Sequence, residues 1–119
     1  MSSIVKLNTI EEWEKLKKDS AEKTELIIFK YSPICAISSS VEDDFNSWFV
    51  NLGEDVNIKC AKVDVIEARP VSQLIAKELE IQHQSPQLIW LNKDTKVKWS
   101  ASHYEINRSQ LSAQLNNDN

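Results

Sequence analysis

Cys35 and Ser38 stand three residues apart, at the point where a strongly apolar segment gives way to an amphipathic one. If Cys35 begins a helix, unpaired backbone N–H groups and a partial positive charge stabilise its thiolate and lower its pKa below about 8.5. The thiolate is the form that attacks disulfides. Dithiol oxidoreductases carry a second, resolving cysteine at the position that Ser38 occupies here. The spacing Cys-x-x-Ser therefore predicts a thiol-disulfide oxidoreductase that works with one thiol.

A buried, unreactive cysteine is the alternative, because free cysteines often serve as small hydrophobic core residues. For Cys35, the strand end before it, the helix after it and the serine at the third following position favour reactivity. For Cys60, which lies inside a predicted strand, we expect the buried and inert state instead of a resolving role. Together with His83 and His103 the two cysteines show no zinc-ligand spacing, so no metal site is predicted.

Hydrophobic periodicity predicts the elements that hold Cys35 in place. Residues 4–7 form a short strand, and Thr9 with Glu12 forms a capping box that opens a helix through about Lys18. Residues 25–31 are a continuous apolar run, which is typical of a strand buried on both faces at the centre of a sheet.

The segment after Cys35 has hydrophobic residues at helical spacing, and Gly53 is predicted to end this helix as its C′ residue. Residues 56–65 alternate and then run apolar as a third strand, which contains Cys60. Pro70 suits the first turn of the next helix. The hydrophobic positions of these two helices are Val41, Phe45, Trp48, Phe49 and Leu52, and then Val71, Leu74, Ile75 and Leu79.

The last third of the chain predicts a hairpin and a helix. Residues 87–91 and 96–99 are strands around a turn over residues 92–95, and a helix runs from residue 108 to about 115. The order βαβαβαββα predicts an α/β sandwich, with a central mixed sheet of about five strands flanked by about four helices. Thioredoxin-like folds have this order.

Composition limits the functions open to the chain. Its 119 residues are predicted to form one domain, 1–119, with a polar end from about residue 116 that frays. Acidic and basic residues are interleaved at a net charge of −4, so we expect no nucleic-acid partner. Gly53 is the only glycine, which excludes a P-loop and a G-x-G-x-x-G nucleotide motif. No apolar run approaches the ~20 residues that cross a bilayer, and the first residues lack an apolar leader, so we expect a cytoplasmic protein without a membrane partner.

Four ordered sequence blocks resemble those of the monothiol bacilliredoxins, a family of the bacillithiol system in low-GC Gram-positive bacteria. The chain departs from the family pattern at two positions, with Ala36 in place of proline and Ile34 in place of threonine. The blocks are Lys30-Tyr31-Ser32 with Ile34-Cys35-Ala36-Ile37-Ser38, Asp64-Val65-Ile66-Glu67-Ala68-Arg69-Pro70-Val71-Ser72, His83-Gln84-Ser85-Pro86-Gln87, and Ser102-His103-Tyr104-Glu105-Ile106.

The resemblance implies a thioredoxin-like fold and a cytoplasmic enzyme that removes bacillithiol from mixed disulfides on proteins by attack of Cys35. It implies no bound cofactor. Bacillithiol is the thiol co-substrate, and the partners are bacillithiolated proteins and bacillithiol. Cys35 is then reset by free bacillithiol or by a separate thiol reductant. It also implies that Pro86 follows a cis peptide bond and faces Cys35. The substrate-binding residues that it implies are Ser32, Pro33, Ile34, Ala36, Ser38, Ser85 and Pro86.

Two alternatives stay open at the level of sequence. A non-catalytic thioredoxin-like adaptor or redox sensor would bind a partner through the groove around Cys35 and Pro86 instead of exchanging thiols. Arg69, at the start of a predicted helix, could clamp a carboxylate of bacillithiol, which carries a malate group, or it could pair with the nearby Glu67.

Overall fold

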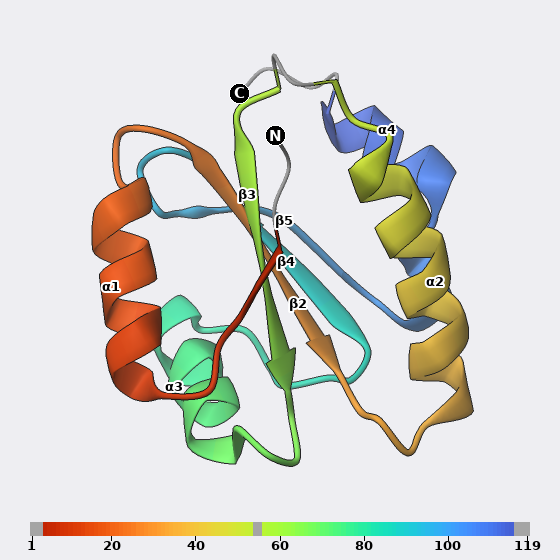
Figure 1. The fold of residues 1–119 in the computed structure, drawn as a ribbon, viewed down its shortest axis with the longest axis horizontal. Coiled ribbons are helices and arrows are strands. Elements are labelled where there is room, and N and C mark those ends of the chain that lie inside the picture. Colours follow the sequence, from red (N-terminus) through yellow and green to blue (C-terminus); the bar gives the residue numbers. More distant parts are fainter. Residues whose placement is uncertain (1–3, 54–55, 116–119) are drawn as a thin grey trace.

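A five-stranded sheet forms the middle of the molecule, with β2 (Glu25–Tyr31) as its central strand (Figure 1). The computed structural model describes residues 4–53 and 56–115, and the polar end predicted to fray lies outside them. Strands β1, β3 and β2 are parallel, β4 is antiparallel to β2, and β5 is antiparallel to β4. The predicted mixed sheet is therefore confirmed. The other strands are β1 (Ile4–Lys6), β3 (Ile58–Asp64), β4 (Gln87–Leu91) and β5 (Val97–Ser102), in the order β1-β3-β2-β4-β5.

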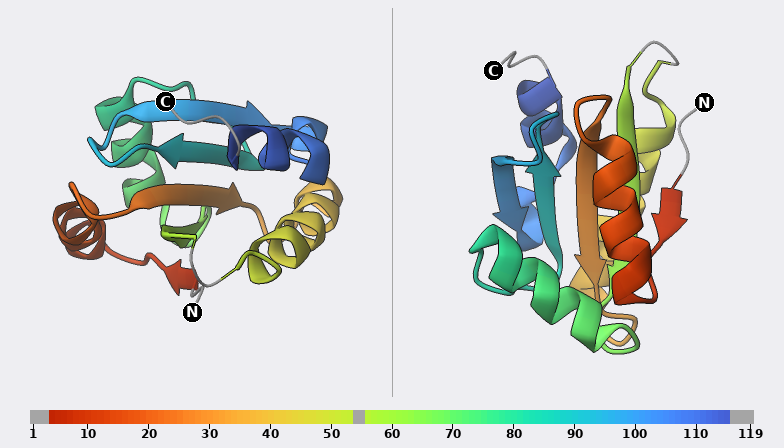
Figure 2. Two further views of the ribbon diagram at one scale, coloured as in Figure 1. Left: turned by 90° about the horizontal axis from the view of Figure 1, so that it is seen from above. Right: turned by 90° about the vertical axis from the view of Figure 1, so that its left-hand side faces the viewer.

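Helices cover both faces of this sheet (Figure 2). Helices α1 (Ile10–Ser20) and α3 (Arg69–Leu79) lie on one face, and α2 (Ala36–Val50) and α4 (Arg108–Leu115) lie on the other. A short 3-10 helix, η1 (His103–Glu105), connects β5 to the segment before α4. Within the described part of the chain, none of the helices has the length and apolar character needed to cross a membrane.

The alternation of side chains along β2 divides the core into two halves. Ile27 and Phe29 pack under α2 and α4, whereas Leu26 and Ile28 pack under α1 and α3. All four are at most 1 % exposed, and burying a side chain of this size stabilises the fold by about 1.5–3 kcal/mol. Because β2 is fixed from both sides, the chain leaves its carboxyl end at a defined place, and the loop that follows carries Cys35.

The predicted capping box at the start of α1 is present. The Glu12 amide donates to Thr9 Oγ1 at 3.1 Å, and Glu12 Oε1 accepts the Thr9 N–H at 3.0 Å. These reciprocal bonds satisfy two donors that a helix start leaves unpaired.

The prediction for the end of α2 is wrong. The helix ends at Val50, and Gly53 does not take the positive φ that a C′ glycine would adopt. Instead, the Asn51 side-chain amide donates to the Ser47 carbonyl oxygen at 2.7 Å, and the Leu52 N–H donates to the Phe49 carbonyl at 3.2 Å. Carbonyl groups at the helix end are thus satisfied before the chain reaches Gly53.

Strand lengths in the second half also differ from the prediction. β3 begins at Ile58, two residues later than expected, and β5 extends to Ser102, three residues beyond the predicted end. Serines have weak strand propensity, so the sequence pattern predicts that the strand ends at Trp99. In the structure, Ser102 still pairs with Gln87 on β4. Helix η1 was not predicted at all, because its one turn is too short for a hydrophobic period.

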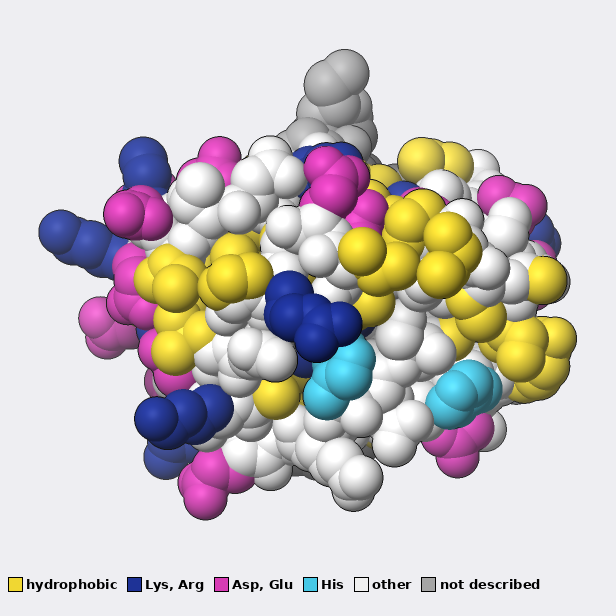
Figure 3. All heavy atoms as spheres, turned by 90° about the horizontal axis from the view of Figure 1, so that it is seen from below, with side chains coloured by type: hydrophobic (Ala, Val, Ile, Leu, Met, Phe, Trp, Pro, Cys, Tyr) yellow, Lys and Arg dark blue, Asp and Glu magenta, His cyan; other side chains and the backbone are white. Residues whose placement is uncertain are grey.

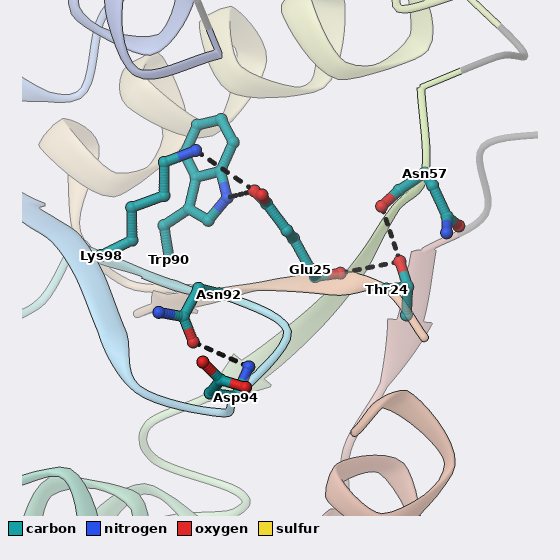
Figure 4. A network of polar contacts seen from close by, with 7 residues as sticks. All are labelled: Thr24, Glu25, Asn57, Trp90, Asn92, Asp94 and Lys98. Atoms are coloured by element: carbon teal, nitrogen blue, oxygen red, sulfur yellow. Dashed lines mark hydrogen bonds and ion pairs between the residues drawn. The ribbon is translucent and has the colours of Figure 1, made fainter. Parts of the chain in front are cut away.

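A polar cluster closes the end of the sheet opposite to Cys35 (Figure 4). The Trp90 indole N–H donates to Glu25 Oε1 at 2.7 Å, and the Lys98 ammonium lies 3.3 Å from the same oxygen and 4.8 Å from the centre of the Trp90 ring. Nearby, Thr24 Oγ1 donates to the Asn57 carbonyl oxygen at 2.7 Å and links the starts of β2 and β3. These contacts link β2 to β4, to β5 and to the start of β3.

Candidate functional site

Cys35 is the N-cap residue of α2, at the end of the four-residue loop that follows β2. Its backbone is extended, with φ −106° and ψ 123°, and its side chain is half-buried. The Cys35 N–H donates to the Ser32 carbonyl at 3.3 Å, and the Cys35 carbonyl accepts the Ser39 N–H at 3.2 Å. The thiol is therefore held where the unpaired N–H groups of the first helical turn gather.

Backbone N–H groups favour the thiolate form of Cys35. The N–H of Ser38 contributes most to lowering the pKa of the Cys35 thiol below its usual value, and the N–H of Ile37 and the Ser38 hydroxyl act in the same direction, while partial burial opposes them. Basic side chains are not among these causes. The helix start itself therefore activates the thiol, as expected for a cysteine at this position.

Ser38 occupies the position of a resolving cysteine, but in this chain it has a structural role. It is only 1 % exposed, and its Oγ accepts a hydrogen bond from the backbone N–H of Ser32 at 3.2 Å. The bond joins the first turn of α2 to the beginning of the loop. Ser38 thus fixes the geometry around Cys35 and supplies no second thiol.

The other cysteine, Cys60, lies in β3 within the core under α2. Its side chain is 1 % exposed, and burial raises the pKa of the Cys60 thiol far above the usual range. Neither cysteine is in a disulfide. The predicted burial of Cys60 is confirmed, and a thiol in this state is a poor nucleophile.

The predicted substrate-binding positions come from two segments that meet at one end of the sheet. In the loop and helix start, Pro33, Ile34 and Ala36 are exposed, and Ser32 is half-buried. In the second segment the Ser85–Pro86 peptide bond is cis, as the family resemblance implies.

The second segment lies beside the first because of strand register. Lys30, near the end of β2, pairs with Gln87 at the start of β4. Pro86 and Ser85 therefore lie next to the chain that leaves β2 for Cys35. Pro86 is buried, and its carbonyl accepts the His103 N–H at 3.1 Å, which also brings η1 to this end of the molecule.

Comparison with known proteins agrees with this geometry. The sequence model of the monothiol bacilliredoxin BrxC matches residues 5–111. The chain belongs to the monothiol bacilliredoxin family. The family and its fold support thiol oxidoreductase chemistry in general terms.

Solved structures similar to this bacilliredoxin have the thioredoxin fold. A protein with a thioredoxin fold, to which oxidoreductase activity has been attributed, is 26 % identical with a TM-score of 0.79, covering 93 % of this chain and 92 % of that one. Thioredoxin from Fasciola hepatica is 15 % identical with a TM-score of 0.71, covering 93 % and 95 %. Oxidized mitochondrial thioredoxin 3 from Saccharomyces cerevisiae is 20 % identical with a TM-score of 0.66, covering 94 % and 92 %. The predicted thioredoxin-like fold is confirmed.

The sequence analysis did not predict that Lys30, near the end of β2 that leads to Cys35, is buried. Lys30 is fully buried, and its Nζ lies 2.9 Å from the Ser72 carbonyl oxygen and 3.4 Å from His83 Nδ1. Burial lowers the pKa of Lys30 to about 8. The sequence did hold a signal, namely a lysine inside an otherwise apolar central strand, since lysine is almost never fully buried without a role or a partner.

The structure tests one of the two alternatives for Arg69, the ion pair with Glu67. Glu67, its expected partner, lies 3.8 Å from the Lys6 ammonium instead, and Arg69 takes part in no ion pair among the residues that the structure describes. Arg69 begins α3 at the same end of the sheet as Cys35. Its guanidinium is exposed and is available for another anion.

Proposed function

We propose that this bacilliredoxin removes bacillithiol from mixed disulfides on proteins, with Cys35 as the nucleophile. The observation that carries the proposal is the position of Cys35 at the start of α2, where the N–H groups of Ser38 and Ile37 stabilise its thiolate. Membership of the monothiol bacilliredoxin family supports bacillithiol as the group removed.

The first step is an exchange between one thiolate and one disulfide. The Cys35 thiolate attacks the bacillithiol sulfur of the mixed disulfide, forms a new S–S bond and breaks the old one. The electron pair of the broken bond leaves with the protein sulfur, so the repaired protein departs as a thiolate. Bacillithiol is then joined to Cys35.

The second step must use an external thiol. Ser38 has no thiol, and Cys60 is buried within the core. The thiolate of free bacillithiol attacks the bacillithiol sulfur on Cys35, so that bacillithiol disulfide forms and the Cys35 thiolate is released. A separate thiol reductant protein could perform the same step. The chemistry requires a reducing compartment, and we therefore propose a cytoplasmic location.

The surroundings of Cys35 suit an extended segment of a protein substrate. Within the described residues, no hydrogen bond uses the main-chain N–H or C=O of Ser85, so both are free to pair with a second chain. Ile34 is 84 % exposed, and Ile66 and Tyr104 are large exposed hydrophobic residues on the two neighbouring segments. We propose that these three side chains contact the substrate beside the disulfide, with Ser32, Pro33, Ala36 and Pro86 forming the groove.

The test is an exchange assay on a purified protein that carries bacillithiol on one cysteine. The parent chain with free bacillithiol should release the bound bacillithiol, and Cys35→Ser should reduce release to the background rate. Cys60→Ala is the matched control and should retain nearly the parent rate, because Cys60 is not accessible. If Cys35→Ser released bacillithiol at the parent rate, the enzymatic role would be wrong and an adaptor or redox-sensor role would replace it.

A further inference from the structure

A second concave site lies at the same end of the sheet, next to the start of α3. Its volume is about 170 Å³. Main-chain and side-chain atoms from the loop after β3, from α3 and from the segment before Pro86 form its walls. The lining residues are Val65, Ile66, Arg69, Ser72, Gln73 and His83.

Three basic side chains gather at this pocket. Arg69 and His83 line it, and the ammonium of Lys30 lies directly behind it, bonded to Ser72 and His83, which are both lining residues. The pKa of His83 is lowered, mostly by burial and further by the charges of Lys30 and Arg69. Both charges are therefore close to the imidazole. A site with this much positive charge favours an anion.

The nearby carboxylates do not neutralise this charge. Asp64 Oδ1 accepts the backbone N–H groups of Ile66 and Glu67, at 2.9 Å and 3.0 Å. The Glu67 carboxylate lies beside Lys6. Among the ion pairs of the described residues, neither Lys30 nor Arg69 has a partner. The pocket therefore holds unpaired positive charge, part of it fully buried, which an incoming anion would compensate.

The pocket is connected to the Cys35 site through two short links. The Val65 N–H donates to the carbonyl of Tyr31 at 3.0 Å, and Tyr31 is the last residue of β2 before the Cys35 loop. His83 precedes Pro86 by three residues. Figure 3 looks onto this end of the molecule, where basic and imidazole side chains lie among exposed hydrophobic ones.

We infer that the pocket formed by Arg69, His83 and Lys30 binds a carboxylate group of the small thiol that reacts at Cys35. The inference rests on the proposed function, since bacillithiol carries a dicarboxylic malate group. Arg69 supplies a planar fork of N–H donors, which suits a carboxylate. Lys30 adds charge from behind the pocket wall. Gln73 also lines the pocket, and it is exposed.

The first test measures binding without thiol chemistry. The Cys35→Ser chain is titrated with L-malate, inorganic phosphate and acetate while the imidazole NMR signals of both histidines are followed. L-malate should shift the His83 signal in a saturable way and raise its pKa, because a bound anion stabilises the imidazolium. The His103 signal is the internal control and should not move. Equal shifts of both histidines, or tighter binding of phosphate than of malate, would overturn the carboxylate assignment.

Variants of the pocket sharpen this titration. Arg69→Gln should weaken malate binding about tenfold, and Gln73→Glu, which adds a negative charge of nearly the same shape, should weaken it as well. Arg108→Gln is the matched control, because Arg108 lies on the opposite face of the sheet, where it donates to Ser47 Oγ at 2.8 Å. Arg108→Gln should bind malate as the parent does. If Arg69→Gln also bound malate as the parent does, the pocket would not be the binding site.

The second test separates this inference from the proposed function. The chain carrying cysteamine on Cys35, which leaves the pocket free, is reacted with bacillithiol or with cysteamine, a thiol without a carboxylate. Arg69→Gln should slow the reaction with bacillithiol about tenfold and leave the rate with cysteamine unchanged. A parent chain that binds malate at His83 but removes no bacillithiol from a protein would defeat the proposed function alone. An active parent whose Arg69→Gln variant keeps the full rate with bacillithiol would defeat the inference alone.

Discussion

The Ser38 hydroxyl oxygen accepts the backbone N–H of Ser32 at 3.2 Å, and this bond spans the loop that carries Cys35. The same hydroxyl helps to lower the pKa of the Cys35 thiol. A serine in the place of a resolving cysteine therefore both supports the loop and tunes the remaining thiol, which is a reason for serine at this position beyond the absence of sulfur.

Replacing Ser38 by alanine should make Cys35 less acidic. The hydroxyl contribution is lost while the N–H groups of Ser38 and Ile37 stay, so the pKa should rise only part of the way to its ordinary value. The partly buried hydrogen bond from the Ser32 N–H is also lost, at a cost of about 1 kcal/mol in the free energy of unfolding. Alkylation rates against pH and denaturant unfolding measure the two effects. Ser39→Ala, an exposed neighbour, is the control, and an unchanged alkylation profile in Ser38→Ala would contradict the assigned effect.

The two thiols should react at very different rates. In the native protein a chromogenic disulfide should titrate one fast thiol, Cys35, and unfolding should expose a second, Cys60, because only the first is accessible. In the Cys60→Ala variant, the alkylation rate of Cys35 should titrate below pH 8.5, the value of a free thiol. Fast native reaction of Cys60, or a disulfide between the two cysteines after oxidation, would identify Cys60 as a resolving residue.

Introducing a thiol at position 38 should convert the site to dithiol chemistry. Ser38→Cys places sulfur three residues after Cys35, in the first turn of the same helix, which is the spacing of dithiol enzymes. Oxidation should then remove two hydrogen atoms by mass and leave no reactive thiol in the native protein. Ser40→Cys, two residues further along α2, should form no internal disulfide and serves as the comparison.

The buried ammonium of Lys30 should make stability depend on pH. Its pKa is about 8 in the folded chain against 10.5 for an exposed lysine. Below pH 8 both states bind the proton, and between about 8 and 10.5 the unfolded state binds more protons, so the stability of the parent rises with pH in this window. The full shift corresponds to about 3 kcal/mol.

The variant Lys30→Met isolates this contribution. It removes a buried charge and keeps a similar volume, so at pH 7 it should be at least as stable as the parent. Between pH 7 and pH 10 the unfolding free energy of the parent should rise relative to that of Lys30→Met, by up to about 3 kcal/mol. Denaturant unfolding of both proteins at each pH measures this change. Parallel pH profiles for the two proteins would mean that Lys30 titrates normally.

The polar cluster around Glu25 should matter for stability and not for reactivity. Glu25→Ala leaves the Trp90 indole N–H and the nearly buried Lys98 ammonium without their shared acceptor, which should cost about 1–3 kcal/mol. Glu25→Gln keeps an acceptor for Trp90 and should cost less. Asp44→Ala is the control at an exposed position, and it should change the unfolding free energy by less than about 0.5 kcal/mol. Because the cluster lies at the far end of the sheet, the alkylation rate of Cys35 should be the same in all three variants, and a changed rate would reveal coupling across β2.

The sequence alone determined most of the architecture. The continuous apolar run of β2 predicted a central strand, the Thr9 capping box predicted the start of α1, and the position of Cys35 before an amphipathic segment predicted a thiol at a helix N-terminus. Each depends on neighbours in the chain or on one periodic pattern, so each can be read locally. The end of α2 could not be read in this way, because the Asn51 side chain caps the helix by donating to the Ser47 carbonyl before the chain reaches Gly53.

Only the tertiary structure decided what surrounds Cys35 and the pocket beside it. Lys30, Ser72 and His83 are far apart in the sequence, and only the pairing of β2 with β3 and β4 and the packing of α3 over the sheet bring them together. Likewise, Glu67 is two residues from Arg69, yet its carboxylate lies beside the ammonium of Lys6 on β1. Ion pairs and buried charges depend on distances across the fold, which spacing along the chain does not fix.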